Sequence, residues 1–121
     1  MNTRVLGADY EKKAAEFLCS LGMEPVEKNY RTRFGEIDLI MKDKETIVFV
    51  EVKFRKSASA GYALDAIDFR KRKQICRIAF QYVMLNDRHT QHKYRFDCIG
   101  IDGDRIKYVK NAFDMNGRVM K

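Results

Sequence analysis

The 121-residue chain has no apolar run near the roughly 20 residues that a membrane helix needs. Its first segment, MNTRVLGADYEKKAAEF, also lacks the apolar middle part of a secretory signal. We therefore expect a cytoplasmic protein with no membrane partner. The three cysteines, Cys19, Cys76 and Cys98, are odd in number and widely spaced, so the sequence indicates neither a disulfide framework nor a CxxC metal site. We expect buried thiols, because free cysteine usually behaves as a small hydrophobic residue.

The length of the chain limits it to one domain. With 121 residues, of which 45% are hydrophobic, two independent domains would each bury very little apolar surface. We predict a single domain over residues 1–121, with its core between about residues 7 and 110. The sequence contains no internal repeat and no low-complexity segment.

Positive charge is concentrated in one segment. The net charge is +7, and residues 53–77 hold eight basic and two acidic side chains, which accounts for nearly all of the excess. The basic residues of this segment are Lys53, Arg55, Lys56, Arg70, Lys71, Arg72, Lys73 and Arg77. Such a cluster favours a polyanionic partner, because neutralised phosphates release their counterions. A solvated, solubilising surface is the alternative interpretation.

Helical periodicity is found in two segments. Apolar residues recur every three or four positions over residues 8–21, and Gly22 is placed to end that helix. A second helix is predicted over residues 62–85, and Lys71 falls on its apolar stripe. We expect Lys71 to point toward the sheet. The neighbouring basic residues off the stripe should face solvent or phosphate: Arg70, Arg72 and Lys73.

Strand periodicity is found before and after the second helix. Strands are predicted at residues 26–31, 36–41 and 46–55, and the segments YRFDCIGI and RIKYV predict a closing hairpin. The order of helix, strands, helix and strands predicts an α/β domain with a mixed sheet and helices on its faces.

Alternation along two of these strands assigns charged residues to faces. In residues 36–41 it predicts Ile37, Leu39 and Met41 on one face, and Glu36, Asp38 and Ile40 on the other. In residues 46–55 it predicts Val48, Val50, Val52 and Phe54 on one face, and Ile47, Phe49, Glu51 and Lys53 on the other. Glu51 and Lys53 then lie where a buried strand leaves the core.

Asp38 and Glu51 are spaced for a shared cation. Twelve residues separate them, enough for an antiparallel return that brings the two side chains to about 5 Å from each other. Mg²⁺ binds one or two carboxylates and completes its shell with water and phosphate. Lys53, on the same face as Glu51, could orient or acidify a metal-bound water or neutralise phosphate. An exposed cross-strand ion pair between Glu51 and Lys53 is the alternative.

The arrangement D-x12-E-x-K is the core of the PD-(D/E)xK nuclease pattern, with Ile37 in place of its loosely required proline. Five segments, YEKKAAEFLCSLG, NYRTRFGEIDLIMKD, VFVEVKFR, AIDFRKRKQI and YRFDCIGI, resemble the YraN-type uncharacterised protein family. That family is similar to archaeal Holliday junction resolvases and belongs with the restriction-endonuclease-like fold. GEIDLI followed by VFVEVK is a specific part of the resemblance.

The resemblance implies a restriction-endonuclease-like domain in which a central mixed β-sheet is flanked by helices. It places Asp38, Glu51 and Lys53 at the catalytic positions, with Asp38 and Glu51 as metal ligands. It also implies a catalytic or metal-binding acid at Glu11, for which an exposed helix acid is the alternative, and a metal or supporting role for Glu36.

Three further residues match the family pattern. Lys71 matches a basic position of the second helix, where it would contact phosphate or the active-site carboxylates, unless its alkyl stem merely covers apolar surface. Arg95 and Asp97 match the pattern in YRFDCIGI, and an ion pair between them is the alternative to a functional role. His89 and His92 are predicted to be solvated.

These features together predict a metal-dependent nuclease that uses Mg²⁺ or Mn²⁺ to hydrolyse DNA phosphodiester bonds, with branched or junction DNA among its candidate substrates. DNA is expected to bind along Arg55, Lys56, Arg70, Lys71, Arg72 and Lys73. One alternative is a nucleic-acid-binding module without catalysis. The other is a protein-interaction or assembly factor on the nuclease scaffold, which could act as a homodimer because resolvases act in pairs.

Overall fold

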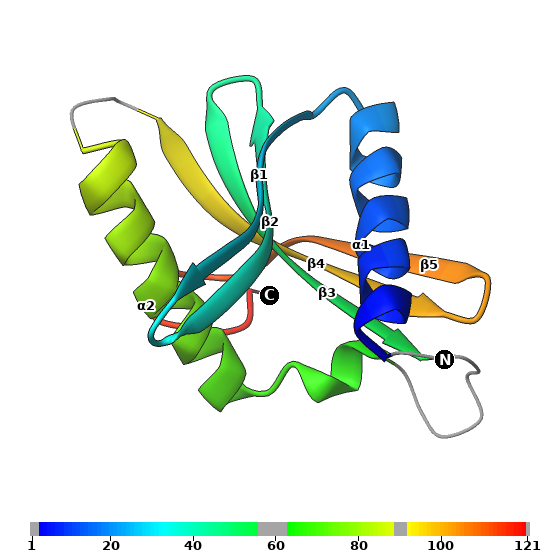
Figure 1. Cartoon of the computed structure of the whole chain (residues 1–121). Helices are drawn as coiled ribbons and strands as arrows, with labels where there is room; N and C mark the ends of the chain where they lie inside the picture. The colour runs from blue at the N-terminus through cyan, green and yellow to red at the C-terminus, as the bar shows by residue number, and fades with distance from the viewer. Residues whose placement is uncertain (1–2, 56–62, 89–91, 121) are drawn as a thin grey trace.

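The fold is a five-stranded mixed β-sheet with one long helix against each face (Figure 1). The computed structural model describes residues 3–55, 63–88 and 92–120. Along the chain its elements are α1 (Thr3–Ser20), β1 (Glu24–Thr32), β2 (Gly35–Asp43), β3 (Thr46–Arg55), the 3₁₀ helix η2 (Ala63–Ala66), α2 (Phe69–Asn86), β4 (Lys93–Asp102) and β5 (Arg105–Phe113). This confirms the predicted α/β domain with a central mixed sheet flanked by helices.

The strands are ordered β1-β2-β3-β4-β5 across the sheet. β3 and β4 pair in parallel, whereas the other three pairs are antiparallel. A parallel pair needs a crossover connection, and the segment that contains α2 provides it. The predicted hairpin of β4 and β5 is confirmed. β3 lies at the centre of the sheet, which explains why its first half is apolar on both faces.

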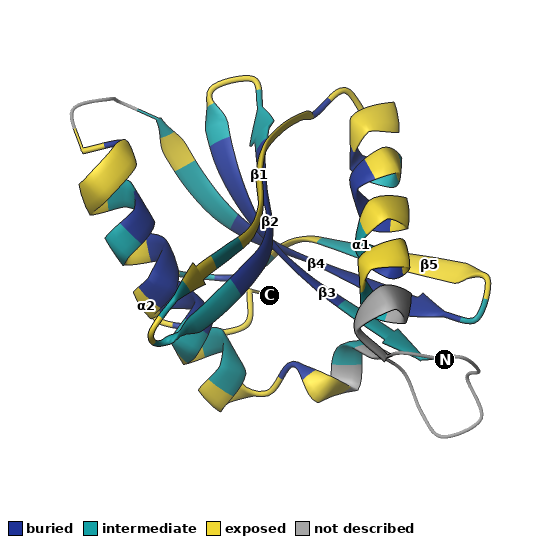
Figure 2. Cartoon of the chain, in the orientation of Figure 1, coloured by how far each residue is buried: buried dark blue, intermediate teal, exposed yellow. Residues whose placement is uncertain are grey.

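Each helix covers its own hydrophobic core, and Figure 2 shows the buried residues lining the sheet where the helices face it. The α1-side core is formed by residues of α1, β2, β3 and β4, among them Ala14, Leu18, Leu39, Val50 and Ile99. The α2-side core includes Ile40, Phe49, Ile78, Ala79 and Phe96. The predicted faces of β3 are confirmed, since Val48, Val50 and Val52 belong to the first core and Ile47 and Phe49 to the second.

The predicted helix over residues 62–85 is wrong at its start. η2 ends at Ala66, and α2 begins at Phe69 after two residues outside either helix. The break occurs at Asp68, whose extended backbone and side-chain oxygen form an N-cap, with Lys71 N donating to Asp68 Oδ1 over 2.9 Å. An aspartate that bonds to the backbone in this way starts a helix more readily than it continues one.

The predicted alternation of β2 is also wrong in part. Ile37 packs in the α2-side core with Ile40, whereas Leu39 and Met41 pack in the α1-side core. The alternation therefore changes phase between Asp38 and Leu39.

The pairing around Asp38 accounts for this change of phase. On the β1 side, Asn29 lies between the pairs Lys28–Leu39 and Tyr30–Ile37, and its φ of 50° is in the left-handed region that asparagine tolerates. On the other side, the β2–β3 ladder runs from Asp43–Thr46 to Leu39–Val50. Asp38 thus lies at an irregular point of the sheet, where period-two reasoning no longer applies.

Several other expectations are settled by the structure. Cys76 and Cys98 are buried as predicted, but Cys19 is exposed on α1, so the expectation of a buried thiol is wrong there. His92 is not merely solvated, because its Nδ1 lies 2.9 Å from Asp87 Oδ1. His89 lies outside the described residues. Neither helix in the described ranges has the length and apolar character that a membrane crossing requires.

Candidate active site

The candidate site is built where β2 and β3 separate. Beyond the Leu39–Val50 pair, Asp38 Oδ2 accepts a hydrogen bond of 2.7 Å from the backbone N–H of Val52. A side-chain carboxylate therefore takes the place of a backbone acceptor at this point of the ladder. Because Asp38 is only 8% exposed and is fixed by this bond, its carboxylate has little freedom to turn away.

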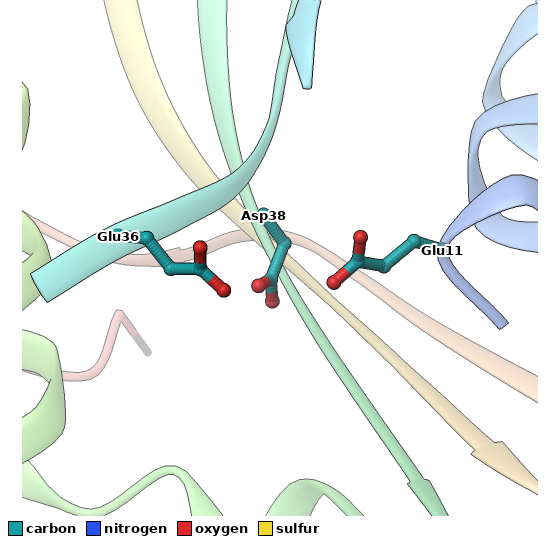
Figure 3. A group of neighbouring side chains, drawn as sticks. All are labelled: Glu11, Glu36 and Asp38. Atoms are coloured by element: carbon teal, nitrogen blue, oxygen red, sulfur yellow. The ribbon is translucent and has the colours of Figure 1, made fainter. Parts of the chain in front are cut away.

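Three carboxylates meet at Asp38. One oxygen each of Glu11, Glu36 and Asp38 lies within 4.8 Å of the others, and Figure 3 shows the three side chains pointing toward one another. Glu36 and Asp38 come from β2, whereas Glu11 reaches across from α1. Carboxylates at such separations repel unless a proton or a cation lies among them. The geometry therefore suits a hard divalent cation, which prefers oxygen ligands.

The electrostatics of Glu11 reflect this crowding. Partial burial, followed by the negative charges of Asp38 and Glu36, raises the pKa of Glu11 to about 7. A side-chain hydrogen bond with Asn29 acts in the opposite direction. Asn29 was not predicted as a site residue. The only sequence signal for it is an asparagine inside a strand, where this residue type is disfavoured unless the backbone needs a left-handed conformation.

Glu51 lies on the other side of Asp38. Its side chain is 3% exposed, with Lys71 Nζ at 3.5 Å and Lys53 Nζ at 3.7 Å from Oε2. Burial is the main cause that raises the pKa of Glu51 to about 8, and the charge of Asp38 and a hydrogen bond with it add to the effect. The two lysines lower this pKa but do not outweigh burial and Asp38. Asp38 is thus shared between the Glu11–Glu36 group and Glu51.

The structure brings together most of the residues predicted for the site. Glu11, Glu36, Asp38, Glu51 and Lys53 form one connected cluster. The prediction that Lys71 points toward the sheet is confirmed, since α2 delivers its ammonium to Glu51. Glu36 has a second partner that was not predicted in this role, because Arg31 Nε lies 3.0 Å from its Oε2.

The residues predicted to bind DNA are less uniform. Arg70 and Lys73 are exposed on α2, and Arg55 is half-buried at the end of β3. Arg72 is held by the protein itself, with Nε donating to the carbonyl of Gly117 over 2.8 Å and Nη1 to that of Ile67 over 2.9 Å. Lys56 lies outside the described residues.

A profile of the Uncharacterised protein family UPF0102 matches residues 10–101. The chain belongs to this family. A UPF0102 protein of Photobacterium profundum is 43% identical over 115 residues, covering 93% of this chain and 92% of the relative. UPF0102 protein FN1370 of Fusobacterium nucleatum is 40% identical over 111 residues, covering 92% of each chain. These names assign no reaction.

In this UPF0102 member, Arg95 and Asp97 form the ion pair that was the alternative to a functional role. Arg95 Nε lies 3.1 Å from Asp97 Oδ1, and Arg95 Nη1 lies 2.9 Å from Asp43 Oδ2. Asp97 also accepts hydrogen bonds from the Tyr108 hydroxyl and from the backbone N–H of Asn111. Alternation along β4 places Asp97 on the α1 side of the sheet, opposite to the face of Glu51.

Proposed function

We propose that the protein is a metal-dependent nuclease that hydrolyses DNA phosphodiester bonds with Mg²⁺ or Mn²⁺ as its cofactor. The observation that carries this proposal is the convergence of Glu11, Glu36 and Asp38 within 4.8 Å, beside the buried Glu51 and its lysines. A carboxyl of this group has its pKa raised to about 7, so the cluster is short of positive charge. A divalent cation supplies that charge, and the donor set consists of the oxygens it prefers.

The ligands and the basic residues have separate roles. The ion would be held by Asp38, Glu11 and Glu36. Glu51, which contacts Asp38, would be a further ligand of the ion. When bound, such an ion lowers the pKa of a coordinated water and neutralises charge on a phosphate. This chemistry would explain why the sequence places Lys53 beside the two acids Asp38 and Glu51.

Lys53 and Lys71 differ in what they can reach. The Lys53 side chain is one-third exposed and its ammonium lies 3.7 Å from Glu51, so it can donate to a phosphate oxygen or to a water while it remains near the carboxylates. Lys71 comes from α2, and its ammonium at 3.5 Å helps to hold the Glu51 carboxylate in place. The two lysines are similarly exposed, so it is the position of Lys53 in the E-x-K pattern that makes it the candidate for direct contact with the reacting phosphate.

The decisive experiment is a cleavage assay with Mn²⁺ on duplex, flap, single-stranded and four-way-junction DNA. We expect Asp38→Asn, Glu51→Gln and Lys53→Met each to lower the cleavage rate by at least about 100-fold. Asp104→Asn, an exposed acid in the β4–β5 turn, is the matched control and should cut at the wild-type rate. Cleavage that survives all three site variants would come from a contaminant or from another site, and would contradict the proposal.

A nucleic-acid-binding module without hydrolysis is the second candidate. It is favoured by the placement of Glu51 between two ammonium groups, an arrangement that a purely structural ion-pair network would also adopt. This candidate predicts DNA binding that weakens as salt rises, with no Asp38-dependent cleavage of any substrate. Binding that does not respond to salt would count against both nucleic-acid functions and would favour a protein-interaction role.

A further inference from the structure

A groove of about 820 Å³ runs along α2, between the β1–β2 turn at Phe34 and the C-terminal segment at Met115. Its charged lining is Arg70, Lys71, Lys73, Arg77 and, as the one carboxylate among the lining residues, Asp68. Asp68 is engaged as the N-cap of α2, where it accepts from a backbone N–H. The groove therefore presents a strongly positive surface, which suits a polyanion.

The groove and the candidate active site share one residue, Lys71. Lys71 lines the groove and also places its ammonium 3.5 Å from Glu51 Oε2. Arg72, the neighbouring residue, is turned away to the carbonyls of Gly117 and Ile67. The basic residues of α2 are thus divided between one that anchors the C-terminal segment and a set that faces the groove.

Arg77 packs against the ring of Phe34. Its guanidinium carbon lies 3.7 Å from the centre of the Phe34 ring, and that of Arg33 lies 4.9 Å from the same centre. The turn that carries Phe34 is tied to α2, because Gln74 Nε2 donates to the Phe34 carbonyl. No ion pair joins Arg77 to a carboxylate in the described part of the chain. A stacked guanidinium without such a partner keeps its N–H edge available for phosphate.

Phe80 provides an aromatic surface at the far end of the groove. It is 57% exposed and lies one helical turn beyond Arg77. From Arg70 to Phe80 the helix rises about 15 Å, which corresponds to about four nucleotides of a stacked strand. A basic track combined with an exposed aromatic ring is the arrangement that binds single strands, since phosphates follow the track and an unpaired base stacks on the ring.

We propose that this groove binds an unpaired DNA strand next to the bond that the active site cuts, with phosphates on Arg70, Lys73 and Arg77 and a base stacked on Phe80. Paired bases inside a duplex do not expose their faces, so a contact with Phe80 selects an unpaired segment. The inference rests on the proposed nuclease function for the position of the cut bond. It narrows the substrate to DNA in which a single-stranded segment adjoins the cleavage site.

The test compares two labelled DNAs by fluorescence anisotropy with the full chain in EDTA: a blunt duplex, and the same duplex with an overhang of about eight nucleotides, twice the span of the groove. We expect the overhang to bind more tightly. Phe80→Ala should raise the Kd of the overhang by about tenfold and leave the blunt duplex unchanged, whereas Phe80→Trp should retain wild-type affinity. Ile106→Ala, on the exposed side of β5, is the matched control and should have no effect.

Arg77→Gln tests the phosphate track separately from stacking. We expect it to weaken binding to the overhang and to reduce the slope of log K against log salt by about 0.7, the value for one phosphate contact on a single strand. Thermal melting of each variant checks that the fold is intact, and both side chains lie at the surface.

The outcomes separate the groove from the nuclease. Equal loss of blunt and overhang binding in Phe80→Ala would overturn the inference, as would a Phe80→Ala protein that binds DNA normally but no longer self-associates in size-exclusion chromatography. Cleavage that depends on Asp38 but not on Phe80 would support the nuclease function and contradict strand binding in the groove. Strand binding that depends on Phe80, without cleavage of any substrate, would support the groove and contradict the nuclease.

Discussion

Glu51 and Asp97 are both buried carboxylates of the central sheet, yet their surroundings differ. Asp97, 1% exposed, accepts hydrogen bonds from Arg95 Nε at 3.1 Å, the Tyr108 hydroxyl at 2.5 Å and the Asn111 N–H at 2.9 Å. Glu51, 3% exposed, faces Asp38 and has ammonium groups only at 3.5 and 3.7 Å within the described ranges. A carboxylate held by short hydrogen bonds stabilises the fold, whereas one that faces another carboxylate and has only two longer ion pairs is available to a cation or substrate.

The largest expected effect on stability is at Asp97, the carboxylate that accepts several hydrogen bonds. Asp97→Asn removes the more deeply buried of the two carboxylates paired with Arg95 and leaves only Asp43, while Arg95 Nη2 already has no hydrogen-bond partner among the described residues. We expect the free energy of unfolding to fall by about 3–5 kcal/mol, measured by urea denaturation. Asp104→Asn at the surface should change it by less than about 0.5 kcal/mol. A loss under about 1 kcal/mol in Asp97→Asn would show that the network is not structural.

Glu51→Gln should have the opposite sign in metal-free protein. The pKa of Glu51 is raised from 4.5 to about 8, so the folded state binds its proton more tightly than the unfolded state. Its contribution is therefore most favourable below about pH 4.5 and is lost as the pH rises toward about 8. We expect Glu51→Gln to raise the free energy of unfolding at about pH 8 by about 4 kcal/mol, with little change at about pH 4.5. Urea denaturation in EDTA across this range measures it; a pH-independent difference would contradict the assignment.

Addition of Mn²⁺ should stabilise the site and not the Asp97 network. At a concentration of about 100 times Kd, binding to the native state adds about 2.7 kcal/mol and raises the melting temperature. Asp38→Asn should abolish this rise in melting temperature, because Asp38 interacts both with Glu11 and Glu36 and with Glu51. Asp104→Asn should retain it. If Asp38→Asn kept the full shift, the ion would bind elsewhere.

The smallest effect is expected at the edge of the site. Arg31 Nε lies 3.0 Å from Glu36 Oε2, but its side chain is largely exposed, and such pairs contribute little. We expect Arg31→Gln to change the free energy of unfolding by less than about 0.5 kcal/mol. It should tighten Mn²⁺ binding slightly, since Glu36 loses a competing cation; calorimetric titration measures this. Weaker Mn²⁺ binding in Arg31→Gln would mean that Arg31 positions Glu36.

The features that the sequence predicted correctly are those with a local cause. Both faces of β3 follow from alternation, because each side chain of an extended strand points opposite to its neighbour whatever packs against it. Lys71 was assigned toward the sheet from its place on the apolar stripe of a helix, and its contact with Glu51 confirms that assignment. The closeness of Asp38, Glu51 and Lys53 was predicted for the same reason, since these residues lie on two adjacent strands joined by a short turn.

The errors arose where a side-chain hydrogen bond or an irregular strand pairing overrode the pattern of apolar positions. Asp68 falls within a helical periodicity, but its side chain caps α2 instead of continuing the earlier turn. Ile37 falls within an alternation, but the irregular pairing at Asn29 and Asp38 moves it to the α2-side core. Neither hydrogen bonding by one side chain nor a change of strand pairing appears in a count of apolar positions.

By itself, the sequence determined the family, the order of helices and strands, and the choice of Asp38, Glu51 and Lys53, because motif spacing and periodicity are properties of the chain. Only the tertiary structure decided that Glu11 joins Glu36 and Asp38, since the distance between residues of different elements depends on how α1 packs on the sheet. It also decided that, among the described residues, Glu51 has two longer lysine ion pairs where Asp97 has short hydrogen bonds, because the solvation of a carboxylate is set by every element around it.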